Sequence, residues 1–144
     1  MTDADNRAKA ISEFNRAQDL FASKRTSEQN SEMLQAALTS RHYWRLVGGE
    51  QEFAISDWLM SRIYVEFNEP RLAVEFAISS LSHKQDGFPY WQKASLFEGL
   101  ARAYKCANKL SEFQHYKKLA LETLALETDA DDAKYIEGQI SELG

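Results

Sequence analysis

Three histidines and one cysteine are the side chains most able to do acid–base or nucleophilic chemistry: His42, His83, His115 and Cys106. None of the histidines belongs to an HExxH motif or a comparable metal-ligand pattern. His115 follows Glu112 by three residues, and His83 lies near Asp86 at a predicted helix end. Each is interpreted as a surface histidine, with a catalytic base as the alternative.

The remaining chemical motifs are weak. Cys106 has no histidine near it in sequence, which favours a packed or partly exposed thiol over a nucleophile. The glycine pair at 48–49 lacks the spacing and the preceding strand of a phosphate-binding loop. No pair of carboxylates stands out as an acid–base couple. We therefore expect no catalytic residue, no metal and no cofactor, and the alternative is an enzyme of unrecognised type.

Tryptophan and arginine suggest binding rather than catalysis. Trp58 and Arg62 share one face of a predicted helix. Trp91 and Arg102 share a stripe with Ser95 and Glu98, because eleven residues make about three helical turns. Tryptophan and arginine are enriched in binding hot spots, and arginine can hold a carboxylate by two hydrogen bonds. The alternative is that Trp58 packs against the first helix pair and that Trp91 packs against Phe88.

A second aromatic cluster lies in the segment TSRHYWRLVGG. His42, Tyr43 and Trp44 are consecutive, so they point around the helix and one neighbour cannot bury them all. Burial within the chain is the favoured interpretation. These three residues are also the candidate oligomer interface.

Composition limits the class of protein. The chain has 144 residues, enough for one domain with a real core, and 44% of them are hydrophobic. A net charge of −5 argues against a nucleic-acid binder that neutralises phosphates. No segment approaches the roughly 20 apolar residues of a membrane span. The polar N-terminal segment is unlike a secretion signal and a single cysteine excludes an internal disulfide, so a cytoplasmic location is expected.

Helical periodicity extends along the whole chain, and no convincing strand pattern interrupts it. We expect a first helix over 4–23, and a second that Ser27 or Ser31 caps and that ends at the glycine pair. A third helix is expected over 50–67, a fourth from 69 or 70, and a break at SHKQDGFP. The prediction is a single all-α domain, 1–144, of three antiparallel helix pairs and a capping helix. The pairs cover about 4–47, 50–83 and 89–127, and the cap covers 129–143, with Thr128 or Asp129 at its start.

The chain also repeats itself. SRIYVEFNEPRLAVEF, from Ser61, is followed 40 residues later by ARAYKCANKLSEFQHY. Arginine, tyrosine and asparagine occur at the same places in both segments, and Arg62 of the first corresponds to Arg102 of the second. Small residues at 61 and 101 let a partner helix approach closely, tyrosines at 64 and 104 fill the core, and asparagines at 68 and 108 make tight turns.

This order of small residue, aromatic residue and tight turn resembles the tetratricopeptide repeat. The resemblance is good over 53–121 and weaker over 8–44. There are departures: the period is 40 rather than about 34 residues, and Trp58 lies one place later than the family's tryptophan. A period near 40 also allows HEAT-like pairs.

The resemblance implies an α-solenoid whose first helices line a concave, peptide-binding groove. It places seven residues on that surface: Trp58, Arg62, Glu66, Trp91, Glu98, Arg102 and Lys105. The groove lacks the lysines and asparagines with which some family members hold the carboxylate of a chaperone tail, so we do not expect such a tail as ligand.

The expected function is therefore a protein- or peptide-binding adaptor, or a chaperone-like holder of one partner segment. Tryptophans would bury apolar anchors and arginines would hold acidic groups. The main alternative is a self-associating structural module whose aromatic surface forms a homodimer. A third alternative is an enzyme or small-molecule binder with a pocket between helix pairs.

Overall fold

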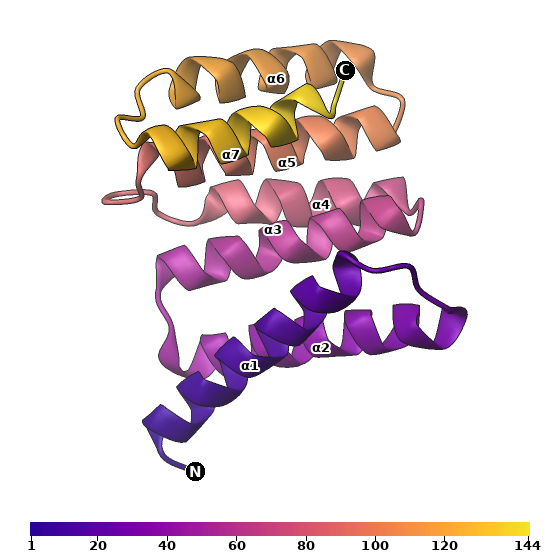
Figure 1. The fold of residues 1–144 in the computed structure, drawn as a ribbon, viewed down its shortest axis with the longest axis vertical. Coiled ribbons are helices and arrows are strands. Elements are labelled where there is room, and N and C mark those ends of the chain that lie inside the picture. The colour runs from indigo at the N-terminus through magenta and orange to yellow at the C-terminus, as the bar shows by residue number, and fades with distance from the viewer.

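A computed structural model describes all residues, 1–144, as seven α-helices without strands, which confirms the all-α prediction (Figure 1). The helices are α1 (Asp3–Phe21), α2 (Ser27–Val47), α3 (Glu50–Glu66), α4 (Pro70–Ser82), α5 (Tyr90–Cys106), α6 (Leu110–Leu124) and α7 (Ala130–Ser141).

Neighbouring helices pack as pairs. The closest packing joins α1 to α2, α3 to α4, and α5 to α6, while α7 contacts both α5 and α6. In Figure 1 the layers follow one another along the long axis, from α1 and α2 near the N-terminus to α5, α6 and α7 near the C-terminus. The stacking order therefore follows the chain order.

Local sequence determines where several helices begin. Asp129 caps α7 by accepting hydrogen bonds from the backbone N–H groups of Asp131 and Asp132, which confirms one of the two predicted caps. The prediction for α2 is wrong: its cap is Thr26, not Ser27 or Ser31. The Thr26 hydroxyl accepts from the Gln29 backbone N–H while the Gln29 side chain accepts from the Thr26 N–H, and this reciprocal box decides the start.

The two repeated asparagines make the same turn. Asn68 and Asn108 have φ angles of 54° and 58° and are the only non-glycine residues with positive φ. After each, a backbone N–H donates across the turn, from Glu69 to the Tyr64 carbonyl and from Lys109 to the Tyr104 carbonyl, both at 2.9 Å. Asparagine tolerates this left-handed conformation better than most residues, so the turn prediction is confirmed.

The repeated small and aromatic residues also have matching roles. Ser61 is 1% exposed, and its hydroxyl donates to the Ala73 carbonyl of α4 at 2.7 Å. Tyr64 stacks on Phe76 with a centroid separation of 5.7 Å, and Tyr104 stacks on Tyr116 at the same separation. The sequence echo therefore corresponds to two helix pairs with the same aromatic stacking.

None of the helices combines the length and apolarity that a bilayer crossing requires.

Candidate functional site: a groove and an arginine pocket

A cavity of about 240 Å³ opens between the first helices of the pairs and α7, and we call it the groove. Its lining comes from α1, α3, α5 and α7. The lining residues are Phe14, Gln18, Ile55, Trp58, Trp91, Gln92, Ser95, Leu96, Tyr135, Ile136 and Gln139. Seven of these eleven are hydrophobic, so the groove suits an apolar group.

Trp58 forms a central part of the groove wall because α5 carries a glycine opposite it. A Cβ atom on Gly99 would lie 2.8 Å from Cδ1 and 3.3 Å from Nε1 of Trp58, closer than ordinary contacts. The indole therefore lies directly against the α5 backbone. The Arg62 guanidinium lies 5.1 Å from the Trp58 ring centroid and 5.1 Å from that of Phe21.

A group of charged and amide side chains from α3, α5 and α7, which we call the polar cluster, contains Arg62, Glu98, Arg102 and Gln139. Glu98 is fully buried, and its Oε1 accepts from Nε and Nη2 of Arg102 at 2.8 and 2.5 Å. Arg102 Nη2 also lies 3.4 Å from the Gln139 carbonyl oxygen, to which it donates. The cluster thereby joins α5 to α7.

Two side chains of the groove lining have buried polar atoms without a hydrogen-bond partner, Trp58 Nε1 and Gln139 Oε1. Two more such atoms, Arg62 Nε and Glu98 Oε2, belong to the polar cluster and lie outside the lining. Two of these four atoms are donors and two are acceptors. Burial lowers the pKa of the Arg62 guanidinium, and the nearby Glu98 carboxylate opposes that effect. Buried polar groups in proteins are nearly always paired, so two unpaired atoms in the lining of one cavity are an unusual feature.

The structure brings together part of the predicted binding surface. Trp58 and Trp91 are half-buried and line the groove, and Arg62 lies beside it. Glu98 is not a surface residue as expected: it is fully buried, and Arg102 pairs with it from the same helix. Arg102 keeps only 19% of its side chain exposed.

Two predicted binding residues lie at helix ends, outside the groove lining. Glu66 is exposed and pairs with Arg25, at 3.1 Å between Oε1 and Nη2. Lys105 donates to the Leu143 carbonyl and lies 5.6 Å over the Phe113 ring, so its ammonium is occupied at the C-terminal end of the fold. Helical phase placed both residues near the stripe but could not reveal these partners.

His42, Tyr43 and Trp44 differ in burial, because consecutive residues of a helix point in different directions. Trp44 is 8% exposed within the single chain, with Arg7 5.1 Å over its ring. His42 is exposed and Tyr43 half-buried, and both border a shallow, open hollow on α2 with Leu34 and Leu38. Of the three, only His42 and Tyr43 therefore remain accessible to another chain.

The other chemical candidates are dispersed. His115 is exposed, with its ring edge against Tyr116, and Cys106 is partly exposed with burial raising the pKa of its thiol. No three histidine, cysteine or carboxylate side chains gather as metal ligands would. His83 is the exception to the surface interpretation, because its ring meets two carboxylates.

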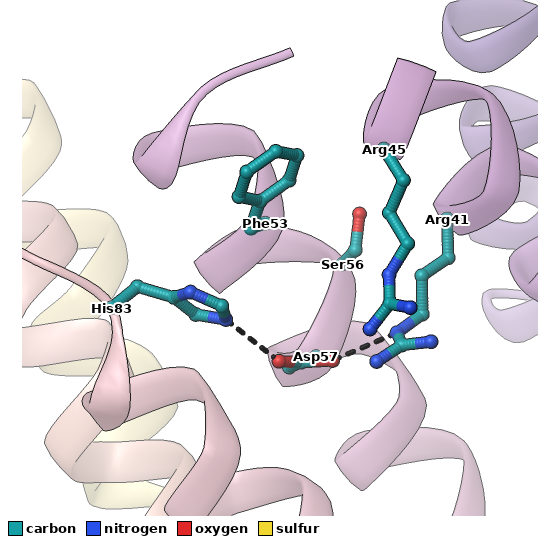
Figure 2. Close-up of a pocket in the computed structure, with 6 residues that line it drawn as sticks. All are labelled: Arg41, Arg45, Phe53, Ser56, Asp57 and His83. Atoms are coloured by element: carbon teal, nitrogen blue, oxygen red, sulfur yellow. Dashed lines mark hydrogen bonds and ion pairs between the residues drawn. The ribbon is translucent and has the colours of Figure 1, made fainter. Parts of the chain in front are cut away.

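His83 belongs to a second cavity, of about 210 Å³, which we call the arginine pocket (Figure 2). It is lined by Arg41, Arg45, Phe53, Ser56, Asp57 and His83. Asp57 is 1% exposed and joins three elements: it accepts from Arg41 Nε at 2.9 Å and Ser79 Oγ at 2.6 Å, and lies 2.9 Å from His83 Nε2.

The arginine pocket is not predicted from the sequence. Two signals were present: Arg41 and Arg45 stand four residues apart on one helix, and Asp57 interrupts the apolar helix α3. Neither signal identifies its partner, because the pairing joins α2, α3 and the end of α4 across the stack.

Comparisons of the chain with protein-family models, with curated proteins and with solved structures found no match.

Proposed function

We propose that this chain is a binding module whose groove holds a short peptide segment of another protein, with an apolar anchor side chain and a neighbouring acidic group. The observation that carries the proposal is an apolar cavity whose lining contains two tryptophans and two buried polar atoms without partners, Trp58 Nε1 and Gln139 Oε1. We also propose that the stack is a diverged relative of the tetratricopeptide repeat. The matched turns at Asn68 and Asn108 support this relationship.

The size of the groove favours a side chain over a metabolite. Small-molecule sites usually enclose about 300–1,000 Å³ and bury most of their ligand. The groove, at about 240 Å³, is smaller and is shared among four helices. One bulky apolar side chain fits this space, while the rest of a peptide lies along the surface.

The polar atoms favour a peptide backbone beside that anchor. An unpaired buried donor or acceptor costs about 1–3 kcal/mol. A peptide offers N–H donors and carbonyl acceptors at every residue, and so meets both kinds of unpaired atom. An aliphatic ligand meets neither.

Charge favours an acidic residue next to the anchor. Arg62 forms no ion pair within the chain, whereas Arg102 pairs with Glu98 and Glu142. A carboxylate of the partner would form an ion pair with Arg62 and accept charge-assisted hydrogen bonds from its guanidinium.

A selection from a random peptide library tests this proposal. Bound sequences should share a bulky apolar residue and an acidic residue close to it. Trp91→Ala should abolish binding and Arg62→Gln should weaken it and remove the acidic preference, while Arg16→Gln on the exposed part of α1 should bind as the wild type does. Failure to enrich any motif, or equal binding by all variants, would contradict the groove.

Self-association is the second candidate. The shallow hollow on α2 carries Leu38, 44% exposed, beside His42 and Tyr43. Light scattering would give twice the mass of 16.5 kDa for a dimer, and Leu38→Glu would return it to the monomer mass. We prefer the groove because this hollow is open and contains no unpaired buried polar atom.

A further inference from the structure

The arginine pocket lies in a different part of the stack from the groove and has a different chemistry. Five of its six lining side chains are polar or charged. Figure 2 shows Arg41 and Arg45 reaching into it from one side and His83 from the other, with Asp57 between them. The pocket is therefore a site for a polar or charged group.

Its charges do not balance. Asp57 pairs with Arg41 through Nε alone, which leaves the terminal nitrogens of that guanidinium without a protein acceptor. Arg45 forms neither an ion pair nor a side-chain hydrogen bond, although its guanidinium lies at the pocket. The pocket lining thus contains two arginines and one carboxylate, and the second carboxylate nearby, Glu50, lies against His83.

A buried hydroxyl adds a neutral donor. Ser56 is 4% exposed, lines the pocket, and its Oγ has no hydrogen-bond partner. Buried hydroxyl groups are nearly always hydrogen-bonded, so an unpaired one is an unusual feature. An oxyanion in the pocket would accept its hydrogen bond.

His83 is not available as a base for Ser56. Its Nε2 lies 2.9 Å from Asp57 Oδ2 and its Nδ1 lies 3.3 Å from Glu50 Oε2. With a carboxylate at each ring nitrogen, the imidazole positions Asp57 and has no free nitrogen to take a proton from serine. The serine, histidine and aspartate therefore do not form a nucleophilic triad.

We propose that the arginine pocket binds a phosphate group, as the free ion or as a phosphomonoester. Both guanidinium groups and the Ser56 hydroxyl supply donors from two helices, more than a planar carboxylate with one negative charge uses. Phosphate carries about 1.5 to 2 negative charges at pH 7 and presents three strong acceptor oxygens, so it can accept from the terminal nitrogens of Arg41 and from Arg45 at once. A pocket of about 210 Å³ also leaves room for the first atoms of a carrier.

Calorimetric titration with inorganic phosphate, glycerol 2-phosphate and acetate, at constant ionic strength in chloride, tests the proposal. Both phosphates should bind and acetate should not. Tighter binding of glycerol 2-phosphate would identify a phosphomonoester as the ligand, and equal binding would identify the free ion. Acetate binding as tightly as phosphate, or no binding of either phosphate, would overturn the proposal.

Variants locate the site. Arg45→Gln removes a side chain without protein partners, so it should leave the fold intact and weaken phosphate binding by about tenfold or more. Ser56→Ala should weaken it severalfold. Arg71→Gln removes an exposed arginine on α4 and should change nothing. Equal binding by Arg45→Gln and Arg71→Gln would show an adventitious surface contact and refute the assignment.

Discussion

Replacing Gly99 with alanine is the most specific perturbation of the groove that the chain offers. The added Cβ would stand 2.8 Å from Cδ1 of Trp58, and that contact must relax. The neighbour is a half-buried indole on the groove wall, so the indole is expected to move toward the cavity of about 240 Å³ that it lines. A single methyl group should then narrow the groove.

Two effects on stability oppose each other in this variant. Alanine is better than glycine in a helix interior by about 1 kcal/mol. Overpacking against Trp58 costs about 1–3 kcal/mol. Gly99→Ala should therefore lower the free energy of unfolding by about 0–2 kcal/mol, the difference of these two effects.

Gly138 on α7 is the matched control. A Cβ at Gly138 would meet nothing within 4 Å, so Gly138→Ala should raise the free energy of unfolding by up to about 1 kcal/mol. Urea denaturation of both variants in the wild-type and Trp58→Ala backgrounds forms a double-mutant cycle. Without the indole, Gly99→Ala should stabilise as Gly138→Ala does, giving a coupling between positions 58 and 99 of about 1–3 kcal/mol. A coupling near zero would refute the contact, and unchanged peptide binding by Gly99→Ala would refute its role in the groove.

Three further variants test other parts of the structure. Asp57→Ala should lower the free energy of unfolding by at least about 3 kcal/mol, because it leaves Arg41 and His83 without their shared carboxylate. The control Asp19→Ala, at an exposed position of α1, should change it by under about 0.5 kcal/mol. Equal effects of the two variants in urea denaturation would contradict the buried network. Asn108→Ala should cost about 1 kcal/mol because φ is 58°, and Asn108→Gly should cost less, so the reverse order would contradict the left-handed turn. Burial raises the pKa of Cys106 above its ordinary value of 9.0, so less thiolate forms at any given pH. The rate of its reaction with Ellman's reagent should therefore still increase with pH at pH 9. A rate that stops increasing below pH 9 would contradict the burial.

The sequence predicted the elements whose causes are local. The asparagine turns follow from a residue type that tolerates positive φ, and the α7 cap follows from the acceptor of Asp129. The start of α2 was misplaced because several hydroxyl residues compete there. Thr26 prevails through Gln29 three residues later, a reciprocal pattern that was visible in the sequence.

The candidate sites depend on contacts between distant helices, which periodicity does not specify. Helical phase groups Trp91 with Glu98, but in the structure Trp91 lines the groove whereas Glu98 is fully buried outside its lining. Likewise, Asp57 meets His83 across 26 residues of sequence, and no local rule pairs them. The sequence shows which residue types could bind a partner. How deeply each side chain is buried, and what it contacts, is visible only in the packed structure.

The central claim, a peptide-binding groove, is tested most directly by the indole resonances in a ¹H–¹⁵N NMR spectrum. Three tryptophans give three indole N–H signals, which tryptophan-to-phenylalanine variants assign. On addition of a library-selected peptide, the Trp58 signal should shift downfield as its unpaired Nε1 gains an acceptor, and the signal of buried Trp44 should not move. A bound peptide that leaves the Trp58 and Trp91 signals unchanged would contradict the groove as the binding site.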